Sequence, residues 1–161
     1  MGRRNKNVLK MFNDNKKDYI EVAVAIIRQG SRLLVAKRPQ GKAFAGKWEF
    51  PGGKIESKES PEECLAREIR EEFGVPVIVR EPLTIWNYKY PDGKGFKFYG
   101  YLCEILEGEP RSLWHSEFLW VEVNNLRTVD LLEADQKIIP LIHKRIWKPG
   151  FQNVKLKYEK N

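Results

Sequence analysis

The chain has 161 residues, of which 42% are hydrophobic and 32% charged, and its formal net charge is +7. The length favours one compact domain, and the composition excludes a collagen-like or wholly disordered chain. The longest apolar run, residues 22–27, is far shorter than the roughly 20 residues that cross a bilayer, and the polar start of the chain does not resemble a signal peptide, so we expect a soluble, cytoplasmic protein without membrane contact.

The positive charge is concentrated near the two ends of the chain. We expect a basic, flexible N-terminal extension over residues 1–18 and a basic C-terminal tail over residues 148–161, which flank one folded domain over residues 19–147. A basic balance suits a polyanionic partner such as a nucleotide phosphate or a nucleic acid. We interpret the two ends as solvated tails.

Strand-like runs dominate the predicted domain. The β-branched, apolar residues 19–27 predict a strand buried on both faces. A turn at residues 29–31 then leads into a second strand over residues 32–36, which we expect to pair with the first. Further strands are predicted at residues 77–79, 83–90, 96–106 and 118–123, with residues 91–93 as the clearest hairpin turn.

Only two segments have a helical pattern. One covers residues 61–73, and the other lies within residues 133–147, where Pro140 predicts a late start or a kink. Strands outnumber helices and do not alternate regularly with them. This pattern favours an α/β (α+β) sandwich with a mixed sheet over a doubly wound fold.

The first predicted helix has clear signals at both ends. Ser60 is suited to the N-cap, Pro61 to the first helical position, and Glu63 to a capping box with Ser60, while Gly74 follows the last turn. These local signals define the helix limits.

Three glutamates of this helix fall on one face. Glu68, Glu71 and Glu72 are spaced at i, i+3 and i+4, next to an apolar stripe. Like charges at this spacing repel, so a cation is expected to relieve them. The alternative is an ordinary solvated face on which Arg67 and Arg70 neutralise the glutamates.

The loop before the helix favours a cation site. Residues 49–54 contain two glycines that allow a close approach of the backbone to a ligand, and Glu59 adds another carboxylate. Oxygen ligands without His or Cys select a hard cation, Mg²⁺ or Mn²⁺. The segment therefore predicts a metal site suited to substrate phosphates.

The same segment resembles the Nudix family. Gly53, Glu59 and the run from Arg67 to Val75 match the box G-x5-E-x7-R-E-U-x-E-E-x-G-U at every fixed position, where U is aliphatic. Similarity to MutT-type nucleoside triphosphate pyrophosphohydrolases extends over roughly residues 19–147, including residues 46–53, 88–92 and 107–110. The resemblance implies an αβα sandwich around a mixed sheet and metal-dependent cleavage of a nucleoside diphosphate linked to another group.

The resemblance also implies roles for individual residues. The metal ligands would be the three helix glutamates with a backbone contribution, and Arg67 would orient Glu68 by a charge-assisted hydrogen bond. Water would attack the β-phosphorus, and the general base would be Glu68 or, as second choice, Glu72. Glu59 is either metal-associated or structural. The implied metal set is Glu68, Glu71, Glu72, Gly52 and Gly53, with Glu117 as the candidate further ligand.

One position departs from the family pattern. MutT-type enzymes often have a further metal-binding glutamate in the loop before the strand at residues 118–123, and Trp114 occupies that position here. His115 and Glu117 are close in sequence. Glu117 could replace the missing ligand, or it could be a surface residue at the strand edge.

Substrate recognition is implied for five residues: Arg38, Glu49, Phe50, Tyr90 and Asp135. Phe50 could equally be a core aromatic and Arg38 a surface cation. Asp135 lies where the enzyme specific for oxidised guanine has Asn; an ionised Asp accepts hydrogen bonds from guanine N1/N2 or cytosine N4. The alternative for Asp135 is an N-cap of the second helix.

The resemblance favours hydrolysis of 8-oxo-dGTP to monophosphate and pyrophosphate with Mg²⁺ or Mn²⁺, in sanitising of the nucleotide pool and hence DNA repair. CTP or dCTP is the alternative substrate. Two other classes are an RNA 5′-end pyrophosphohydrolase and a non-catalytic module that recognises oxidised bases. We expect a nucleoside triphosphate as partner, no stable nucleic-acid complex, and a monomer or homodimer.

Overall fold

The computed structural model describes residues 19–146. The predicted N-terminal extension and C-terminal tail, with residue 147, lie outside these residues. Within them, no helix is both long and apolar enough to span a membrane.

Within residues 19–146, seven strands form one mixed sheet. They are β1 (Ile20–Gln29), β2 (Arg32–Lys37), β3 (Trp48–Glu49), β4 (Gly52–Lys54), β5 (Val77–Lys89), β6 (Gly95–Ile105) and β7 (Glu117–Glu122). The order is β3-β2-β1-β6-β5, with β4 beside β1 and β7 beside β2. Only the β1–β6 pair is parallel among these neighbours. The predicted mixed α+β architecture is confirmed.

The central strand β1 has different neighbours from those expected. It pairs with β6 from Ile20 opposite Phe96 to Ile27 opposite Cys103, and with β4 on its other edge. The predicted pairing with β2 is confined to the last two residues of β1, next to the turn. Because β4 occupies that edge of β1, β2 continues past β1 and pairs with β3 through Ala36 and Lys37. The opposite edge of β2 pairs with β7 over six residue pairs.

Helix α2 (Pro61–Phe73) has the predicted limits. Ser60 Oγ accepts a hydrogen bond from the Glu63 N–H at 3.1 Å, and the Glu63 carboxylate accepts one from the Ser60 N–H at 2.8 Å. At the other end, Gly74 has a φ of 71° and donates its N–H to the carbonyl of Arg70. The capping box and the C-terminal glycine are confirmed.

The C-terminal part of the domain contains three short helical segments. A 3-10 helix, η1 (Val123–Thr128), precedes α3 (Glu133–Gln136) and α4 (Ile139–Ile146). Pro140 is the second residue of α4, where a missing N–H costs no helical hydrogen bond. The predicted interruption is therefore a break between two helices.

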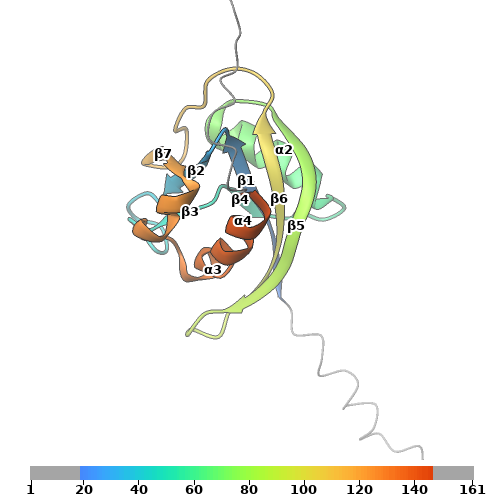
Figure 1. Cartoon of the computed structure of the whole chain (residues 1–161). Helices are drawn as coiled ribbons and strands as arrows, with labels where there is room; N and C mark the ends of the chain where they lie inside the picture. Colours follow the sequence, from blue (N-terminus) through green and yellow to red (C-terminus); the bar gives the residue numbers. More distant parts are fainter. Residues whose placement is uncertain (1–18, 147–161) are drawn as a thin grey trace, which may run out of the picture.

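Helices cover both faces of the sheet, because alternate residues of β1 point to opposite sides. Ala23, Ala25 and Ile27 pack with the apolar stripe of α2. Val24 and Ile26 pack with residues of η1, α3 and α4. In Figure 1, α2 accordingly lies behind the sheet and α3 and α4 lie in front of it. The αβα sandwich implied by the resemblance is confirmed.

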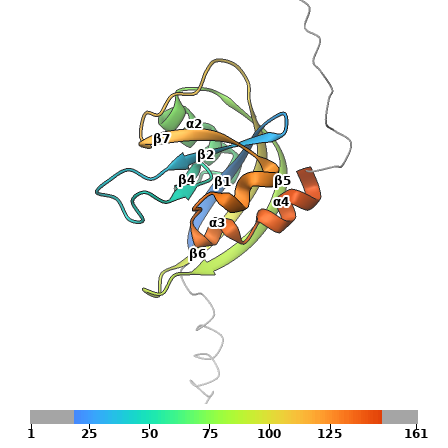
Figure 2. The same ribbon diagram turned by 60° about the vertical axis from the view of Figure 1, so that its left-hand side comes forward.

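Two projecting segments frame the region where α2 and α3 approach the central strand. Figure 2 shows the loop of residues 38–47, in cyan, and the tip of the β5–β6 hairpin extending from the body of the domain. Between β3 and β4, Phe50 and Pro51 run beside β1, and the Ala25 N–H donates to the Pro51 carbonyl at 2.8 Å. This arrangement brings residues 49–54 next to the acidic face of α2.

Candidate active site

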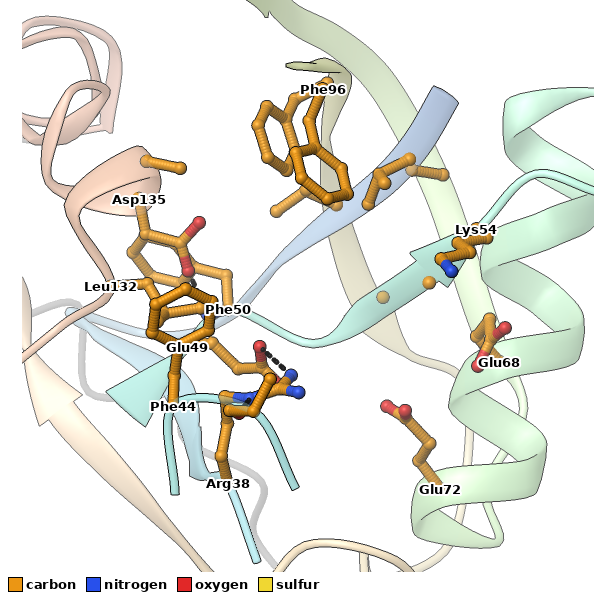
Figure 3. Close-up of a pocket in the computed structure, with 18 of the residues that line it drawn as sticks. Arg38, Phe44, Glu49, Phe50, Lys54, Glu68, Glu72, Phe96, Leu132 and Asp135 are labelled. Atoms are coloured by element: carbon orange, nitrogen blue, oxygen red, sulfur yellow. Dashed lines mark hydrogen bonds and ion pairs between the residues drawn. The ribbon is translucent and has the colours of Figure 1, made fainter. Parts of the chain in front are cut away.

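A cavity of about 740 Å³ lies between β1, residues 49–54, α2, α3 and the β5–β6 hairpin. Its two ends differ in character (Figure 3). Glu68, Glu71 and Glu72 line the acidic end. The aromatic end is lined by Phe44, Phe50, Tyr90, Phe96, Phe98, Leu132, Ala134 and Asp135. The structure thus brings most of the predicted site residues into one cavity.

The acidic end holds more carboxyl groups than the neighbouring cationic side chains keep ionised. The side chains of Glu68 and Glu72 point from α2 into the cavity (Figure 3). Glu72 Oε2 is buried and has no hydrogen-bond partner among the described residues. Burial, followed by repulsion from Glu68 and Glu49, raises the pKa of Glu72 to about 9. Burial also raises the pKa of Glu68, against the opposing effect of Arg67.

Arg67 organises the carboxylates around the start of α2. Its Nη1 donates to Glu68 Oε1 at 2.8 Å, which is the hydrogen bond predicted from the sequence, and lies 3.4 Å from Glu71 Oε2. Its Nε and Nη2 donate to the two oxygens of Glu59 at 2.7 and 3.0 Å. Nη2 also donates to the Lys54 carbonyl at 3.2 Å. One guanidinium therefore joins α2 to the loop before it.

Glu59 is fully engaged in this network. Besides the two bonds from Arg67, its Oε2 accepts a hydrogen bond from the Glu56 N–H at 2.9 Å. The hydrogen bonds from Arg67 are the main reason why the pKa of Glu59 is lowered to about 2. Glu59 is not among the residues that line the cavity. This geometry favours the structural alternative for Glu59.

The two glycines of the loop are required by close contacts. A Cβ on Gly53 would lie 2.3 Å from the Glu68 carboxyl carbon, and a Cβ on Gly52, whose φ is 152°, would lie 2.0 Å from the Ala23 carbonyl oxygen. Any other residue would displace either β1 or the Glu68 carboxylate. The Gly53 carbonyl contacts the Cys64 thiol at 3.5 Å.

The donor chemistry of the acidic end fits a hard divalent cation. All its side-chain donors are oxygens, and the unpartnered Glu72 oxygen is a position that a cation would satisfy. Across residues 19–146, no three acidic, His or Cys side chains converge into a complete metal centre. Mg²⁺ commonly uses one or two carboxylates together with water and substrate phosphates, which is consistent with this open arrangement.

Asp135 lies at the opposite end of the cavity, in α3. It is buried, and its Oδ2 accepts a hydrogen bond from the backbone N–H of Phe50 at 2.8 Å. Burial, followed by repulsion from Glu49, raises the pKa of Asp135 to about 8. The N-cap of α3 is Leu132 and makes no side-chain capping bond, so the capping alternative for Asp135 is wrong. Packing of α3 on residue 50 directs Asp135 into the cavity instead.

Glu49 lies between Arg38, which lines the cavity, and the buried side chain of His115. Its oxygens accept hydrogen bonds from Arg38 Nη1 at 3.1 and 2.9 Å, and its Oε1 lies 2.9 Å from His115 Nε2. Arg38 also donates from Nε to the Ala43 carbonyl at 2.6 Å and lies over the ring of Trp114 at 5.6 Å. Arg38 is therefore held in place by three groups, the Glu49 carboxylate, the Ala43 carbonyl and the Trp114 ring, and is not a free surface cation.

Trp114 occupies the loop position at which MutT-type enzymes often have a further metal-binding glutamate. This position is part of the cavity, but a tryptophan side chain cannot bind Mg²⁺. Trp114 lines the cavity, and its ring packs edge-to-face on His115 at 4.7 Å. Glu117 is exposed at the start of β7 and pairs with Lys37 at 3.2 Å, outside the residues that line the cavity. The structure thus places Glu117 as a strand-edge surface residue.

Several residues that line the cavity were not predicted from the sequence. They include Phe44, Lys54, Lys94 and Phe96, together with Trp114, which was not expected to line the cavity. Phe44 stacks on Tyr90 at 4.9 Å between ring centroids, and it comes from a loop whose sequence has no periodic pattern. Trp114 was detectable only as a departure from the family pattern, and its contact with Arg38 depends on tertiary packing.

Comparison with a family model described as "NUDIX domain" matches residues 19–142. The 8-oxo-dGTP diphosphatase of Haemophilus influenzae is 36% identical over 124 residues, which cover 76% of this chain and 90% of that protein. The CTP pyrophosphohydrolase of Escherichia coli is 32% identical over 123 residues, which cover 76% of this chain and 88% of that protein.

Solved structures are similar as well. The crystal structure of a MutT NUDIX hydrolase from Burkholderia pseudomallei superposes with a TM-score of 0.68 at 26% identity. The match covers 78% of this chain and 99% of that one. The structural similarity therefore extends over almost the full length of the Burkholderia pseudomallei chain.

Proposed function

Because the chain belongs to the NUDIX domain family and is a Nudix hydrolase, we propose that it hydrolyses (deoxy)nucleoside triphosphates to monophosphate and pyrophosphate with Mg²⁺ or Mn²⁺. One observation carries this proposal: a single cavity has a carboxylate-rich end and an aromatic end with a buried carboxylate. The first suits a phosphate chain with its cation, and the second suits a nucleobase.

The cation would be held by Glu68, Glu71 and Glu72 with a backbone carbonyl. Gly52 is our first choice for that carbonyl, because the Gly53 carbonyl already contacts the Cys64 thiol. Glu117 is left out of this set because it pairs with Lys37 at the surface. A cation bound there would neutralise charge on the phosphate oxygens and would lower the pKa of a water molecule.

The protein groups then position and deprotonate that water. Glu68 accepts its proton, with Glu72 as second choice, and Arg67 holds Glu68 by the 2.8 Å hydrogen bond. The water oxygen forms a bond to the β-phosphorus. The bond from that phosphorus to the oxygen bridging the α-phosphate breaks, so the monophosphate leaves with the bridging oxygen and the water oxygen remains in pyrophosphate.

The base specificity follows from Asp135 and its surroundings. One relative is named for 8-oxo-dGTP and another for CTP, and we favour 8-oxo-dGTP with CTP or dCTP as the second candidate. The second candidate is favoured by the residue itself, because a carboxyl oxygen of Asp135 accepts from the exocyclic amine of cytosine. The proposed biological role is removal of damaged or excess nucleotides.

Steady-state kinetics over canonical, oxidised and methylated nucleoside triphosphates tests the substrate class. We expect the highest kcat/KM for 8-oxo-dGTP, activity only with Mg²⁺ or Mn²⁺, and loss of activity on chelation. Glu71→Gln and Glu72→Gln should reduce kcat at limiting Mg²⁺. Equal, wild-type kcat in both variants would contradict the ligand set.

Hydrolysis in ¹⁸O-labelled water tests the reaction type. We expect the label in pyrophosphate and unlabelled monophosphate. Label in the monophosphate would show attack at the α-phosphorus, and label confined to orthophosphate would show attack at the terminal phosphorus. Either result would overturn the proposed bond cleavage.

A further inference from the structure

A buried histidine lies between the two ends of the cavity. The side chain of His115 has no exposed surface, and its Nε2 is 2.9 Å from Glu49 Oε1. On the opposite side of the ring, Nδ1 is 4.0 Å from Glu72 Oε2. His115 Nδ1 and Glu72 Oε2 are both buried, and neither atom has a hydrogen-bond partner within residues 19–146. These two unpartnered atoms therefore face each other across a gap too long for a hydrogen bond.

The loop that carries this histidine is attached to the end of α2. The Leu113 N–H donates to the Glu72 carbonyl at 2.9 Å, and the Arg111 N–H donates to the Phe73 carbonyl at 3.0 Å. The His115 ring stacks on Phe73 with centroids 5.4 Å apart and planes at 19°. These contacts fix the ring relative to the helix turn that carries Glu72, so a small change at the ring acts directly on that carboxylate.

The other nitrogen connects the ring to the nucleotide side of the cavity. Both the Arg38 guanidinium and His115 Nε2 are hydrogen-bonded to the Glu49 carboxylate. Arg38 lines the cavity together with Phe44. A continuous series of side chains thus runs from Arg38 through Glu49 and His115 to Glu72. With Nε2 donating to Glu49, Nδ1 of a neutral ring is an acceptor, so the bond that closes the 4.0 Å gap is donated by the protonated Glu72 carboxyl and orients it before a cation takes the place of that proton. Buried groups with unmade hydrogen bonds are costly, which favours this bond.

We propose that His115 is a positioning residue that holds Glu49 through Nε2 and aligns Glu72 through Nδ1, and thereby couples occupancy of the nucleobase end to the geometry of the acidic end. The proposal rests on the proposed function, because it takes Glu72 as a cation ligand. It adds a role for a residue that is not among those lining the cavity. Partners that orient metal ligands typically contribute about ten- to a hundredfold to metal affinity or activity.

Nitrogen-15 NMR of histidine-labelled protein tests the contacts without any turnover. The chain has only two histidines, so a His143→Gln variant assigns both ring spectra. At one fixed pH, Glu49→Gln should shift the Nε2 signal of His115, and Glu72→Gln should shift the Nδ1 signal. Mg²⁺ should move Nδ1 in the wild-type protein and leave it unmoved in Glu72→Gln. An Nδ1 signal that responds to neither change would overturn the proposal.

His115→Phe tests the consequence, because it preserves the stacked ring and removes both nitrogens. We expect Mg²⁺ half-saturation to rise and kcat/KM to fall by about tenfold or more, and the ranking of bases to change in the same direction as in Glu49→Gln. The matched control is His143→Phe, which makes the same change at a histidine of α4 outside the residues that line the cavity; it should leave Mg²⁺ half-saturation and base ranking unchanged.

The outcomes separate this proposal from the proposed function. If His115→Phe lowers only Tm, with Mg²⁺ half-saturation and base ranking unchanged, the histidine is structural and the proposal is wrong. If His115→Phe does not fold, the NMR shifts of the wild-type and glutamine variants still decide it. Absence of nucleotide hydrolysis in the wild-type protein would overturn the proposed function, whereas the NMR result would stand by itself.

Discussion

The carboxylate of Asp135 accepts a hydrogen bond from the backbone N–H of Phe50 at 2.8 Å, across 85 residues of sequence. The bond joins α3 to the segment that leads into the loop glycines, so the aromatic and acidic ends of the cavity share a support. It uses one oxygen, Oδ2, and Asp135 also lines the cavity. Asp135 is therefore suited both to structure and to base recognition.

Substitution of Asp135 should affect activity and stability together. Asp135→Ala removes the acceptor of the Phe50 N–H and leaves that buried donor unpaired, which costs about 1–3 kcal/mol. We expect a lower free energy of unfolding and a roughly ten- to hundredfold lower kcat/KM. Asp135→Asn keeps an acceptor for Phe50, so it should retain more stability than Asp135→Ala. Asn carries a donor at every pH, whereas the Asp135 carboxyl loses its donor above its pKa of about 8, so the ranking of bases should shift towards 8-oxoguanine in assays above that pH.

The measurement is kcat/KM for guanine, 8-oxoguanine and cytosine triphosphates, with urea unfolding of each variant. Unchanged relative kcat/KM values in both variants, together with a loss of stability in Asp135→Ala, would leave Asp135 with the structural role alone.

The same carboxylate predicts a pH dependence of stability. Its pKa is about 8 in the folded protein against an ordinary value of 3.8. Between these values the folded protein binds a proton that the unfolded chain has released, so the contribution of Asp135 is full below about pH 4 and is lost as pH rises through about 8. Asp135→Asn lacks this titration and should gain stability relative to wild type over that range.

Urea unfolding midpoints of the metal-free proteins, taken from about pH 4 to pH 9, measure this difference. A constant difference between wild type and Asp135→Asn across the range would show that Asp135 is ionised in the folded protein.

Cation binding should release a proton from Glu72. The pKa of this carboxyl is about 9 because it is buried beside other carboxylates, whereas a cation binds the ionised form. Near neutral pH, Mg²⁺ binding should therefore release about one proton, and Mg²⁺ affinity should increase as pH rises towards 9. Calorimetry in two buffers with different ionisation enthalpies measures the number of protons.

Glu72→Gln should abolish this proton release. Glu62→Gln is the matched control, because Glu62 is exposed on the same helix; it should release the same number of protons as wild type. Tight Mg²⁺ binding without proton release in the wild-type protein would place the cation away from Glu72.

Glu59 should behave as a structural partner of Arg67. Glu59→Gln loses the charge that both guanidinium hydrogen bonds use, so Arg67 holds Glu68 less firmly and kcat should fall by about tenfold. The pKa of Glu59 is about 2 in the folded protein against an ordinary 4.5, so its contribution to stability is present above about pH 4.5 and is lost as pH falls towards 2.

Mg²⁺ titrations of activity and acid unfolding of Glu59→Gln check this role. We expect unchanged Mg²⁺ half-saturation and a weaker loss of stability in acid than in wild type. A large increase in Mg²⁺ half-saturation, of the size expected for Glu72→Gln, would instead make Glu59 a cation ligand.

The sequence alone was sufficient for the family, the sandwich and the limits of α2. The capping box of Ser60 and Glu63, the terminal Gly74 and the spacing of the three glutamates all depend on residues three or four positions apart. Interactions at this range are formed by the helix itself, so their pattern is visible in the sequence. The hydrogen bond from Arg67 to Glu68 has the same origin.

Tertiary structure decided the remaining features. The strand order around β1, the buried bond between Asp135 and Phe50, and the contacts of His115 with Glu49 and Glu72 join residues tens of positions apart. Such contacts depend on how helices and loops pack on the sheet, and local patterns do not encode them. The sequence therefore determined which residues supply carboxylates, whereas packing determined which of them line the cavity, which hold others in place, and which stay at the surface.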